Sequence, residues 1–561
     1  MKYSELAKLY EELGKTAKRL EKTAILSKFL KDISEEDAPS VIYMLQGKVF
    51  PPWSEKKIGM SSRLILKVIA NSSGISQEKV ELSWKKTGDL GKTAEEIIKT
   101  KKQSTLYSTA LTIKKVFENI KKLAELEGKG TVDKKVNLIS ELLTSAKPDE
   151  AKYIVNTILE TLRVGVADGT MRDAISKAFN IEVEKIQHAY NVSNDFSQVL
   201  ISAKKGELSE LKLSLTKPIK CMLALKEDTI ESAFERTGKP AQLENKYDGF
   251  RLQIHKHNNQ IYLFTRRLEN VTKQFAELVP IIKSHVKGEE FILDSEAVGY
   301  DPKTKKYLPF QNVSQRIRRK YDIEKIAAKI PVEINVFDIM FYNGKSMINE
   351  QFKERRELIE KIIKPEKYKI VPAKKLVTSS EKDAEKFFKE SLEQGNEGLM
   401  FKKLDAPYKP GARVGFMIKY KNVMETLDLV ITKAEWGEGK RASWLSSFTL
   451  SCRNGDSFLE IGKVGTGIKE KEGLTFKQLT KVLKPLIEKE IGKTVILKPK
   501  IVVEIAYEEI QKSVNYSSGY ALRFPRVIKQ RIDLSAKDCD DIKKVEQLYK
   551  QQRGKKFISK L

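Results

Sequence analysis

The chain contains few of the residues that build disulfide frameworks and metal centres. Its 561 residues include only three cysteines, Cys221, Cys452 and Cys539, and four histidines. An odd number of widely separated cysteines indicates neither a disulfide framework nor a zinc cluster, and a reducing cytoplasm is the expected setting. The pair His255 and His257 comes without further metal ligands nearby in the sequence, so we predict that both are surface residues.

Long apolar segments are also absent. No stretch approaches the roughly 20 apolar residues that a membrane-spanning helix needs, and the N-terminus is amphipathic rather than typical of a signal peptide. We therefore expect no membrane partner. The last three residues, Ser559, Lys560 and Leu561, match a peroxisomal address, which we interpret as a coincidence.

Positive charge, by contrast, is abundant. The sequence has 104 Lys and Arg against 76 Asp and Glu, a formal net charge of +28. Such an excess favours a polyanionic partner, although a ribosomal, membrane-surface or solubilising role remains open from charge alone. The length predicts several domains.

The segment ENKYDGFR, residues 244–251, surrounds Lys246 with groups suited to a nucleotide phosphate. A lysine amine becomes a nucleophile when cationic neighbours or desolvation favour its neutral form, and Arg251 could supply such a charge. Asp248 could orient the amine or a metal, and Gly249 lets the backbone approach a ligand closely. The alternative is an exposed loop with ordinary charges.

Further charged segments follow this one in order along the chain. Each also fits a strand of alternating polar and apolar residues. They are TRRLENVT with Arg266 and Asn270, FILDSEAVGYD with Glu296, VFDIMFYNG with Phe337, EGLMFKKLD with Glu397 and Lys402, GARVGFMIKYKN with Arg413, Lys419 and Lys421, and ALRFPRVIKQRID with Arg523, Arg526, Lys529, Arg531 and Asp533.

In content and order these segments resemble the motifs of the covalent nucleotidyltransferases, the superfamily of DNA ligases, RNA ligases and mRNA capping enzymes. The resemblance implies that Lys246 attacks the α-phosphate of ATP and forms a lysyl-AMP. The AMP then passes to a 5′-phosphate, and a 3′-hydroxyl displaces it to seal the strand.

The resemblance also assigns roles to the other residues. Glu244 would accept a hydrogen bond from the adenine amino group, and Phe337 would stack on the base. Arg251 and Arg266, with Arg413 as a further candidate, would bind ribose, phosphate or the 5′-phosphate of a nick. Lys419 and Lys421 would share one face of a strand and meet the α-phosphate. The proposed ligands of Mg²⁺, or of Mn²⁺, are Glu296 and Glu397.

The region before these motifs indicates which branch of the superfamily the chain resembles. Residues 1–215 are predicted to be helical, because Leu6, Leu9, Tyr10 and Leu13 keep helical spacing, as do Ile113, Val116, Phe117 and Ile120. The segments GDLG (88–91), LRVGVADGT (162–170), AYNVSNDF (189–196) and KPIKCMLA (217–224) resemble the helical DNA-binding domain of archaeal and eukaryotic replicative DNA ligases. The glycine-containing turns in the first two segments lead into predicted helices and could bind phosphate, or could simply cap those helices.

The expected architecture is therefore multidomain. It comprises an all-α DNA-binding domain (1–215), an α+β adenylation domain (216–422) and a β-barrel OB-fold domain (423–561), whose strands are predicted from segments such as DLVITKAEW and SSFTLSCR. Arg523, Arg526, Lys529, Arg531 and Asp533 would contact the ATP phosphates from the OB-fold. The chain departs from the family pattern at Met417, where tryptophan is usual, and at Leu534, where lysine is common.

The segment QSTLY, residues 103–107, resembles a shortened sliding-clamp-binding peptide through Gln103, Leu106 and Tyr107. The alternative is a loop leading into a helix. We predict an ATP-dependent DNA ligase that acts as a monomer on nicked double-stranded DNA and binds a sliding clamp. The alternatives are an RNA ligase or capping-type guanylyltransferase, which the helical first domain argues against, and a catalytically silent DNA-binding scaffold.

Overall fold

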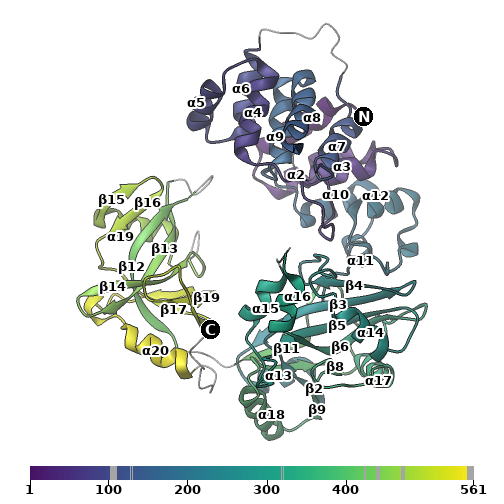
Figure 1. The fold of residues 1–561 in the computed structure, drawn as a ribbon, viewed down its shortest axis with the longest axis vertical. Coiled ribbons are helices and arrows are strands. Elements are labelled where there is room, and N and C mark those ends of the chain that lie inside the picture. Colours follow the sequence, from purple (N-terminus) through teal and green to yellow (C-terminus); the bar gives the residue numbers. More distant parts are fainter. Residues whose placement is uncertain are drawn as a thin grey trace. The chain divides into compact units, whose positions relative to one another are not determined.

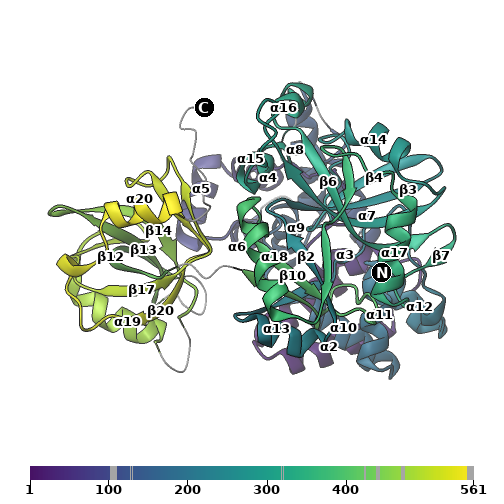
Figure 2. The ribbon, with the colours of Figure 1, turned by 90° about the horizontal axis from the view of Figure 1, so that it is seen from below.

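The computed structural model describes residues 1–101, 110–126, 128, 130–317, 319, 321–421, 425–437, 443–468 and 474–551. The chain folds into two compact units, each assembled from separate stretches of sequence. The first comprises Met1–Ala224, Gly249–Ala373 and Leu404–Val414, and the second comprises Leu225–Asp248, Lys374–Lys403 and Gly415–Leu561. Figures 1 and 2 show the elements of each unit.

The first unit begins with an all-helical region, as its sequence periodicity predicts (Figure 1). In α1 the residues Leu6, Leu9, Tyr10 and Leu13 are all buried, and one apolar core joins the helices. The helices are α1 (Tyr3–Lys15), α2 (Arg19–Lys31), α3 (Ala38–Leu45), α4 (Ser62–Ser73), α5 (Gln77–Thr87), α6 (Leu90–Lys99), α7 (Ile113–Lys122), α8 (Thr131–Ser145), α9 (Pro148–Ile158), α10 (Asp168–Phe179), α11 (Val183–Ser193), α12 (Phe196–Lys205) and the short η1 (Leu208–Glu210).

The glycine-containing turns of this region do lead into helices. Asp89 caps α6 by accepting a hydrogen bond from the backbone N–H of Lys92 (2.9 Å), and α10 begins at Asp168. Gly91 allows α6 to approach α9, because a Cβ at this position would lie 2.4 Å from Oδ1 of Asn156. Packing therefore accounts for Gly91, and phosphate binding by these turns stays a prediction.

The same unit contains a mainly antiparallel sheet with the order β4-β3-β5-β6-β7, in which β8 pairs with β6 in parallel. The apolar side chains of β3, β5 and β6 form its core, and α17 packs against β6 (Figure 2). The strands are β3 (Phe250–His257), β4 (Gln260–Thr265), β5 (Phe291–Gly299), β6 (Val332–Tyr342), β7 (Lys345–Ser346) and β8 (Ile370–Pro372); the helices are α14 (Leu278–His285), α15 (Phe310–Ile317), α16 (Ile323–Lys329) and α17 (Phe352–Ile362).

The second unit contains a sheet of order β1-β11-β10-β2-β9 with its own small apolar core under α13 and α18. Neighbouring strands β10, β11 and β2 are antiparallel, so their side chains are aligned in rows across the sheet. The elements are β1 (Leu223–Glu227), α13 (Ile230–Thr237), β2 (Ala241–Lys246), β9 (Lys375–Thr378), α18 (Glu381–Glu393), β10 (Gly398–Lys402) and β11 (Arg413–Lys421).

The C-terminal part of this unit is rich in strands, as predicted. Its main sheet has the order β14-β13-β12-β16-β15, β17 pairs with both β12 and β20, and α19 and α20 pack against β13 (Figure 2). The elements are β12 (Leu427–Trp436), β13 (Leu445–Asn454), β14 (Ser457–Val464), α19 (Phe476–Leu483), η3 (Lys484–Leu486), β15 (Ile487–Ile491), β16 (Thr494–Leu497), β17 (Val502–Ala506), β18 (Glu509–Lys512), β19 (Tyr520–Arg523), β20 (Arg526–Gln530), η4 (Ala536–Asp538) and α20 (Ile542–Gln551).

The three cysteines are buried thiols. Burial raises the pKa of Cys221 and of Cys452 to about 12 and that of Cys539 to about 11. Within the described residues, none of the helices is both long and apolar enough to cross a membrane. The domain limits after residues 215 and 422 stay predictions.

The prediction that His255 is a surface residue is wrong. Its side chain is fully buried in β3, where its ring nitrogens lie 2.9 Å from the backbone oxygen of Leu215 and 2.9 Å from Oε1 of Gln253. His257 is partly exposed and lies 2.8 Å from Glu290. The lack of nearby metal ligands was no guide to exposure here, because both faces of β3 are covered at this point.

His255 gives the unfolding equilibrium a defined pH dependence. Burial lowers its pKa from 6.5 to about 3, so the unfolded chain binds a proton over this range that the folded chain does not. Stability is therefore complete above pH 6.5 and is lost as the pH falls toward 3, by about 1.4 kcal/mol per pH unit from this residue.

We expect H255Q to remove this dependence. Between pH 7 and pH 5 the free energy of unfolding of the wild type should fall by about 2 kcal/mol more than that of H255Q. Urea unfolding at both pH values, followed by fluorescence, measures the difference. Parallel losses of stability in the two proteins would contradict the assignment.

Candidate functional site

The sheet of β2, β10 and β11 aligns the predicted phosphate-binding residues. Lys246 pairs with Gly398, which pairs on its other side with Lys421. One step along the same face, Glu244 pairs with Met400, which pairs with Lys419. Because directly paired residues of an antiparallel sheet project from the same face, the lysines and Glu244 form two adjacent rows on one face. The expectation that Lys419 and Lys421 share a face agrees with this register.

Glu397, at the start of β10, connects the two lysines of the first row. Its Oε2 atom lies 2.9 Å from Nζ of Lys246 and 2.7 Å from Nζ of Lys421, and its backbone N–H donates to the carbonyl of Lys246 (2.8 Å). Burial raises the pKa of the Glu397 carboxyl, but the charges of the two lysines outweigh this effect and hold its pKa well below the usual range. The Glu397 carboxyl is therefore a weak base that stays ionised.

Gly398 keeps this row compact. Its φ is +150°, and a Cβ at this position would lie 2.2 Å from the backbone oxygen of Tyr420. Any side chain would push β10 away from β11 and displace Lys421 from Glu397. The residue between the two lysines thus has to be glycine for the cluster to form.

Glu244 lies deeper in the sheet than Glu397. Its Oε2 lies 2.7 Å from Nζ of Lys402, and its Oε1 accepts a hydrogen bond from Nε2 of Gln242 (2.7 Å). Glu244, Lys402 and Gln242 are each only 2% exposed. The predicted adenine-binding carboxylate is therefore held by two side chains from β2 and β10.

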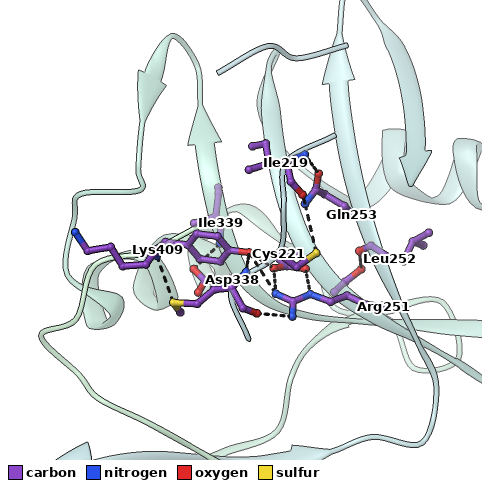
Figure 3. Close-up of polar contacts among 12 residues, drawn as sticks. Ile219, Cys221, Arg251, Leu252, Gln253, Asp338, Ile339 and Lys409 are labelled. Atoms are coloured by element: carbon purple, nitrogen blue, oxygen red, sulfur yellow. Dashed lines mark hydrogen bonds and ion pairs between the residues drawn. The ribbon is translucent and has the colours of Figure 1, made fainter. Parts of the chain in front are cut away.

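Arg251, at the start of β3, is held in a cage of hydrogen bonds (Figure 3). It makes a bidentate ion pair with Asp294, in which Nε donates to Oδ1 (2.8 Å), and its Nη1 donates to the backbone oxygen of Met222 (2.9 Å). Its Nη2 also donates to the hydroxyl of Tyr408 (3.3 Å). Burial alone would lower the pKa of Arg251, but the charge of Asp294 outweighs it and raises this pKa above its ordinary value.

This cage changes what Arg251 can do for a ligand. A guanidinium has five N–H donors, and the contacts with Asp294, Met222 and Tyr408 use four of them. In this arrangement Arg251 therefore cannot bind a phosphate through two parallel hydrogen bonds. It can donate one further hydrogen bond, from Nη1. The guanidinium also lies 5.2 Å from the ring centre of Phe337, in cation–π range.

Glu296 and Arg266 lie on or beside the same sheet, whereas Arg413 begins a strand of the other sheet. Glu296, half-buried on β5, pairs in register with Arg251. Gly249 allows the approach of β3 to β5, because a Cβ there would lie 2.3 Å from the backbone oxygen of Ala297. Arg266 is exposed just beyond β4, and Arg413 is exposed at the first position of β11.

In the C-terminal region three of the predicted phosphate-binding residues, Arg523, Lys529 and Arg531, already have carboxylate partners. Arg531 lies 2.6 Å from Asp428 and 2.7 Å from Asp533. Lys529 lies 3.5 Å from Glu504, and Arg523 lies 3.2 Å from Glu509. Arg526 is exposed on β20. A phosphate would have to exchange with these carboxylates, and Asp533 acts here as a partner of Arg531.

The residues predicted to bind a sliding clamp lie outside the described part of the chain. Gln103, Leu106 and Tyr107 fall in the undescribed segment 102–109, and the terminal tripeptide is likewise undescribed.

The sequence reasoning missed two residues that hold Arg251, Asp294 and Tyr408. Asp294 stands two residues before Glu296 on the same strand, a spacing that could have identified it. Tyr408 carried no such signal, because its contacts with Asp294 span 114 positions.

No group of three or more Asp, Glu, His or Cys side chains gathers as a metal site within the described residues. The predicted ligands Glu296 and Glu397 offer carboxylate oxygens, the type of ligand that Mg²⁺ prefers.

Family models match three parts of the chain: "DNA ligase N terminus" at residues 2–176, "ATP dependent DNA ligase domain" at 221–421, and "ATP dependent DNA ligase C terminal region" at 441–534. The chain is thus a multidomain protein with a helical N-terminal region, a nucleotidyltransferase domain and a strand-rich C-terminal domain.

Curated relatives extend the match over the whole chain. A DNA ligase of Nanoarchaeum equitans is 47% identical over 563 residues, 99% of both chains, and one of Thermococcus fumicolans is 42% identical over 98% of both. A solved chain named Pmar-Lig_PreS3 shares the fold with a TM-score of 0.59 at 16% identity, covering 94% of this chain and 99% of that one. The chain belongs to the family of ATP-dependent DNA ligases.

The Lys246–Glu397–Lys421 cluster predicts the effect of removing its anion. E397Q leaves two ammonium groups facing an uncharged amide, so we expect a loss of about 2 kcal/mol in stability. Added pyrophosphate should raise the melting temperature of E397Q more than that of the wild type, because it replaces the lost negative charge.

The control is E390Q, which removes a half-exposed carboxylate 3.3 Å from Lys374 in the same unit. Its cost should stay within about 0.5 kcal/mol. Equal melting temperatures for the two variants would contradict the electrostatic account of the cluster.

The cage around Arg251 predicts that Y408F is destabilising. The Tyr408 hydroxyl accepts from the backbone N–H of Met222 (3.0 Å) and donates to Oδ2 of Asp294 (2.8 Å). Its loss leaves a buried N–H unpaired and should cost about 1–3 kcal/mol. Denaturant unfolding measures this cost, with Y262F as the control, because the Tyr262 hydroxyl bonds to Gln260 at the surface. A loss no larger than that of Y262F would count against the cage.

Proposed function

We propose that this chain is an ATP-dependent DNA ligase that seals 3′-hydroxyl/5′-phosphate nicks in duplex DNA, acting in replication, repair and recombination. The observation that carries the proposal is the row of Lys246, Gly398 and Lys421 with Glu397 between the lysines. Two ammonium groups held this close are costly unless an anion lies between them. Glu397 supplies that anion in the absence of nucleotide, and the α-phosphate of ATP would share the role on binding.

In the first step, the neutral amine of Lys246 attacks the α-phosphorus of ATP. A P–N bond forms, the bond to the bridging oxygen breaks, and pyrophosphate leaves. Lys421 and Lys419, from the neighbouring strand, stabilise the negative charge that develops on the phosphoryl oxygens. Because the pKa of Glu397 is low, its carboxylate orients the two lysines more effectively than it would store the proton of Lys246.

The resemblance to the family assigns the contacts with the nucleotide. Glu244 accepts from the adenine amino group, Phe337 stacks on the base, and Arg251 donates one hydrogen bond to ribose or phosphate. Arg266 and Arg413, both exposed, bind phosphate or the 5′-phosphate of the nick. Glu296 and Glu397 are assigned as ligands of Mg²⁺, or of Mn²⁺, which would supply further positive charge to the phosphates.

The second and third steps use DNA. An oxygen of the 5′-phosphate attacks the phosphorus of lysyl-AMP, which frees Lys246 and forms a DNA-adenylate. The 3′-hydroxyl then attacks the 5′-phosphorus, and AMP leaves as the phosphodiester bond forms. Activation as an anhydride gives this last step a good leaving group.

The assignment extends to domains and partners. Residues 1–215 form the DNA-binding domain, 216–422 the adenylation domain and 423–561 an OB-fold domain. From the OB-fold, Arg523, Arg526, Lys529 and Arg531 contact the ATP phosphates during the first step, and Asp533 holds Arg531. The enzyme is a monomer and binds a sliding clamp through Gln103, Leu106 and Tyr107. The net charge of +28 supports the assignment of DNA as the polyanionic partner.

The test is the covalent intermediate. Protein first stripped of bound AMP with pyrophosphate is incubated with Mg²⁺ and ATP labelled at the α-phosphate, and then separated by denaturing electrophoresis. Wild type should retain the label, and K246A should retain at least about 1,000-fold less, because the nucleophile is absent. The control K226A removes an exposed lysine of β1 in the same unit and should label normally.

A nicked DNA duplex and a matching nicked RNA duplex then identify the polynucleotide substrate. Labelled wild-type protein should seal the DNA nick without further ATP, because the bound AMP suffices for one turnover. Absence of label from ATP on the stripped wild type would exclude the proposed enzyme.

A further inference from the structure

Glu244, Lys402 and Gln242 form a polar group with little access to water. Lys402 and Glu244 are each only 2% exposed, and their charged atoms lie 2.7 Å apart. Gln242 donates to the second carboxylate oxygen at 2.7 Å. Lys402 and Gln242 are cross-strand partners in the register of β10 and β2, one step from the row that contains Glu244.

Stability alone is a poor explanation for this group. Burying an ion pair costs desolvation energy that its attraction barely repays, and apolar residues of similar size often stabilise a protein as well or better. The aromatic and aliphatic core under this sheet, including Leu243 and Phe401 on the opposite faces of the same strands, shows that apolar packing is available nearby. A buried charge pair at this point is better explained by a need for a defined charge and geometry.

We propose that Lys402 is a positioning residue that fixes Glu244 as an ionised, acceptor-only group and thereby makes the site select a purine with an amino group at position 6. This inference rests on the proposed function, in which Glu244 faces the base. It names the residues that would determine the choice between adenine and a 6-oxo purine.

The discrimination follows from hydrogen-bond chemistry. An ionised carboxylate accepts hydrogen bonds and donates none, whichever groups already contact it. A 6-amino group donates to it, whereas a 6-carbonyl would place two acceptors against each other in a buried site. Without the ammonium of Lys402, the Glu244 carboxylate would lose the contact that fixes its orientation, and its alignment with a 6-amino group would be lost.

The experiment compares ATP with inosine triphosphate, which carries a carbonyl group at position 6. Both are labelled at the α-phosphate, and kcat/KM for lysyl-nucleotide formation is measured on stripped protein. The wild type should prefer ATP by at least about 100-fold, as expected where a buried polar group is left unpaired by the wrong substrate. In K402M this preference should fall to about 10-fold or less, and in K402R, which keeps the charge, it should stay within about threefold of the wild type.

The matched control is K256M. Lys256 is also a buried strand lysine, 8% exposed, and its ammonium donates to the backbone oxygen of Gly288 at 2.7 Å. This variant should keep the wild-type ratio even if it melts at a lower temperature. A purely structural role for Lys402 would lower both rates in K402M and leave their ratio unchanged, which would overturn the proposal.

Two further outcomes are separable. If K402M does not fold, Q242L is measured instead, because it removes the second donor to Glu244. A reduced preference for ATP over inosine triphosphate supports the proposal, and an unchanged preference overturns it. If stripped wild type gains no label from either nucleotide, the proposed function itself fails. If the wild type gains label from ATP and folded K402M keeps the wild-type preference for ATP, only the role of Lys402 is refuted.

Discussion

The proximity of two lysine ammonium groups to one carboxylate is the constraint around which the candidate site is arranged. Lys246 and Lys421 come from β2 and β11, and only the intervening strand β10 brings them to the same oxygen of Glu397. Like charges at this separation repel strongly in a partly desolvated site. The glycine between them, the antiparallel register and the low pKa of Glu397 all serve to maintain this arrangement. A phosphate that binds here therefore meets a positive field that already exists and needs little reorganisation of the protein.

The remaining charges of the site are also held in fixed pairs, and the pairs differ in burial. Glu397 lies near the surface, with a side chain 17% exposed, where a phosphate can exchange with it. Glu244 and Lys402 lie inside the sheet, where exchange with solvent ions is much harder. Arg251 is held by Asp294 and Tyr408, so that its direction is fixed before any ligand arrives. Burial therefore distinguishes the Lys246–Glu397–Lys421 cluster, which solvent ions can reach, from the Glu244–Lys402 pair, which they reach much less easily.

Much of this arrangement could be predicted from the sequence, because its determinants are local. Helical spacing identified the buried face of α1, and the two-residue spacing of Lys419 and Lys421 predicted a shared strand face. The contacts that could not be predicted join distant segments, such as Tyr408 with Asp294 or Lys402 with Glu244. His255 shows the same limit: it has no metal partners nearby in the sequence, but only the tertiary structure shows that its side of the strand is covered.

The burial of all three cysteines has a practical consequence for work on this protein. Their thiols are shielded from reagents, and their raised pKa values leave almost no reactive thiolate near neutral pH. The natural chain should therefore react very slowly with maleimide dyes. A pair of cysteines introduced at exposed positions, one beside β1 and one on α20, would carry donor and acceptor fluorophores without first removing the native thiols. Energy transfer between such dyes would report in solution any change in the distance between these two positions when a ligand binds.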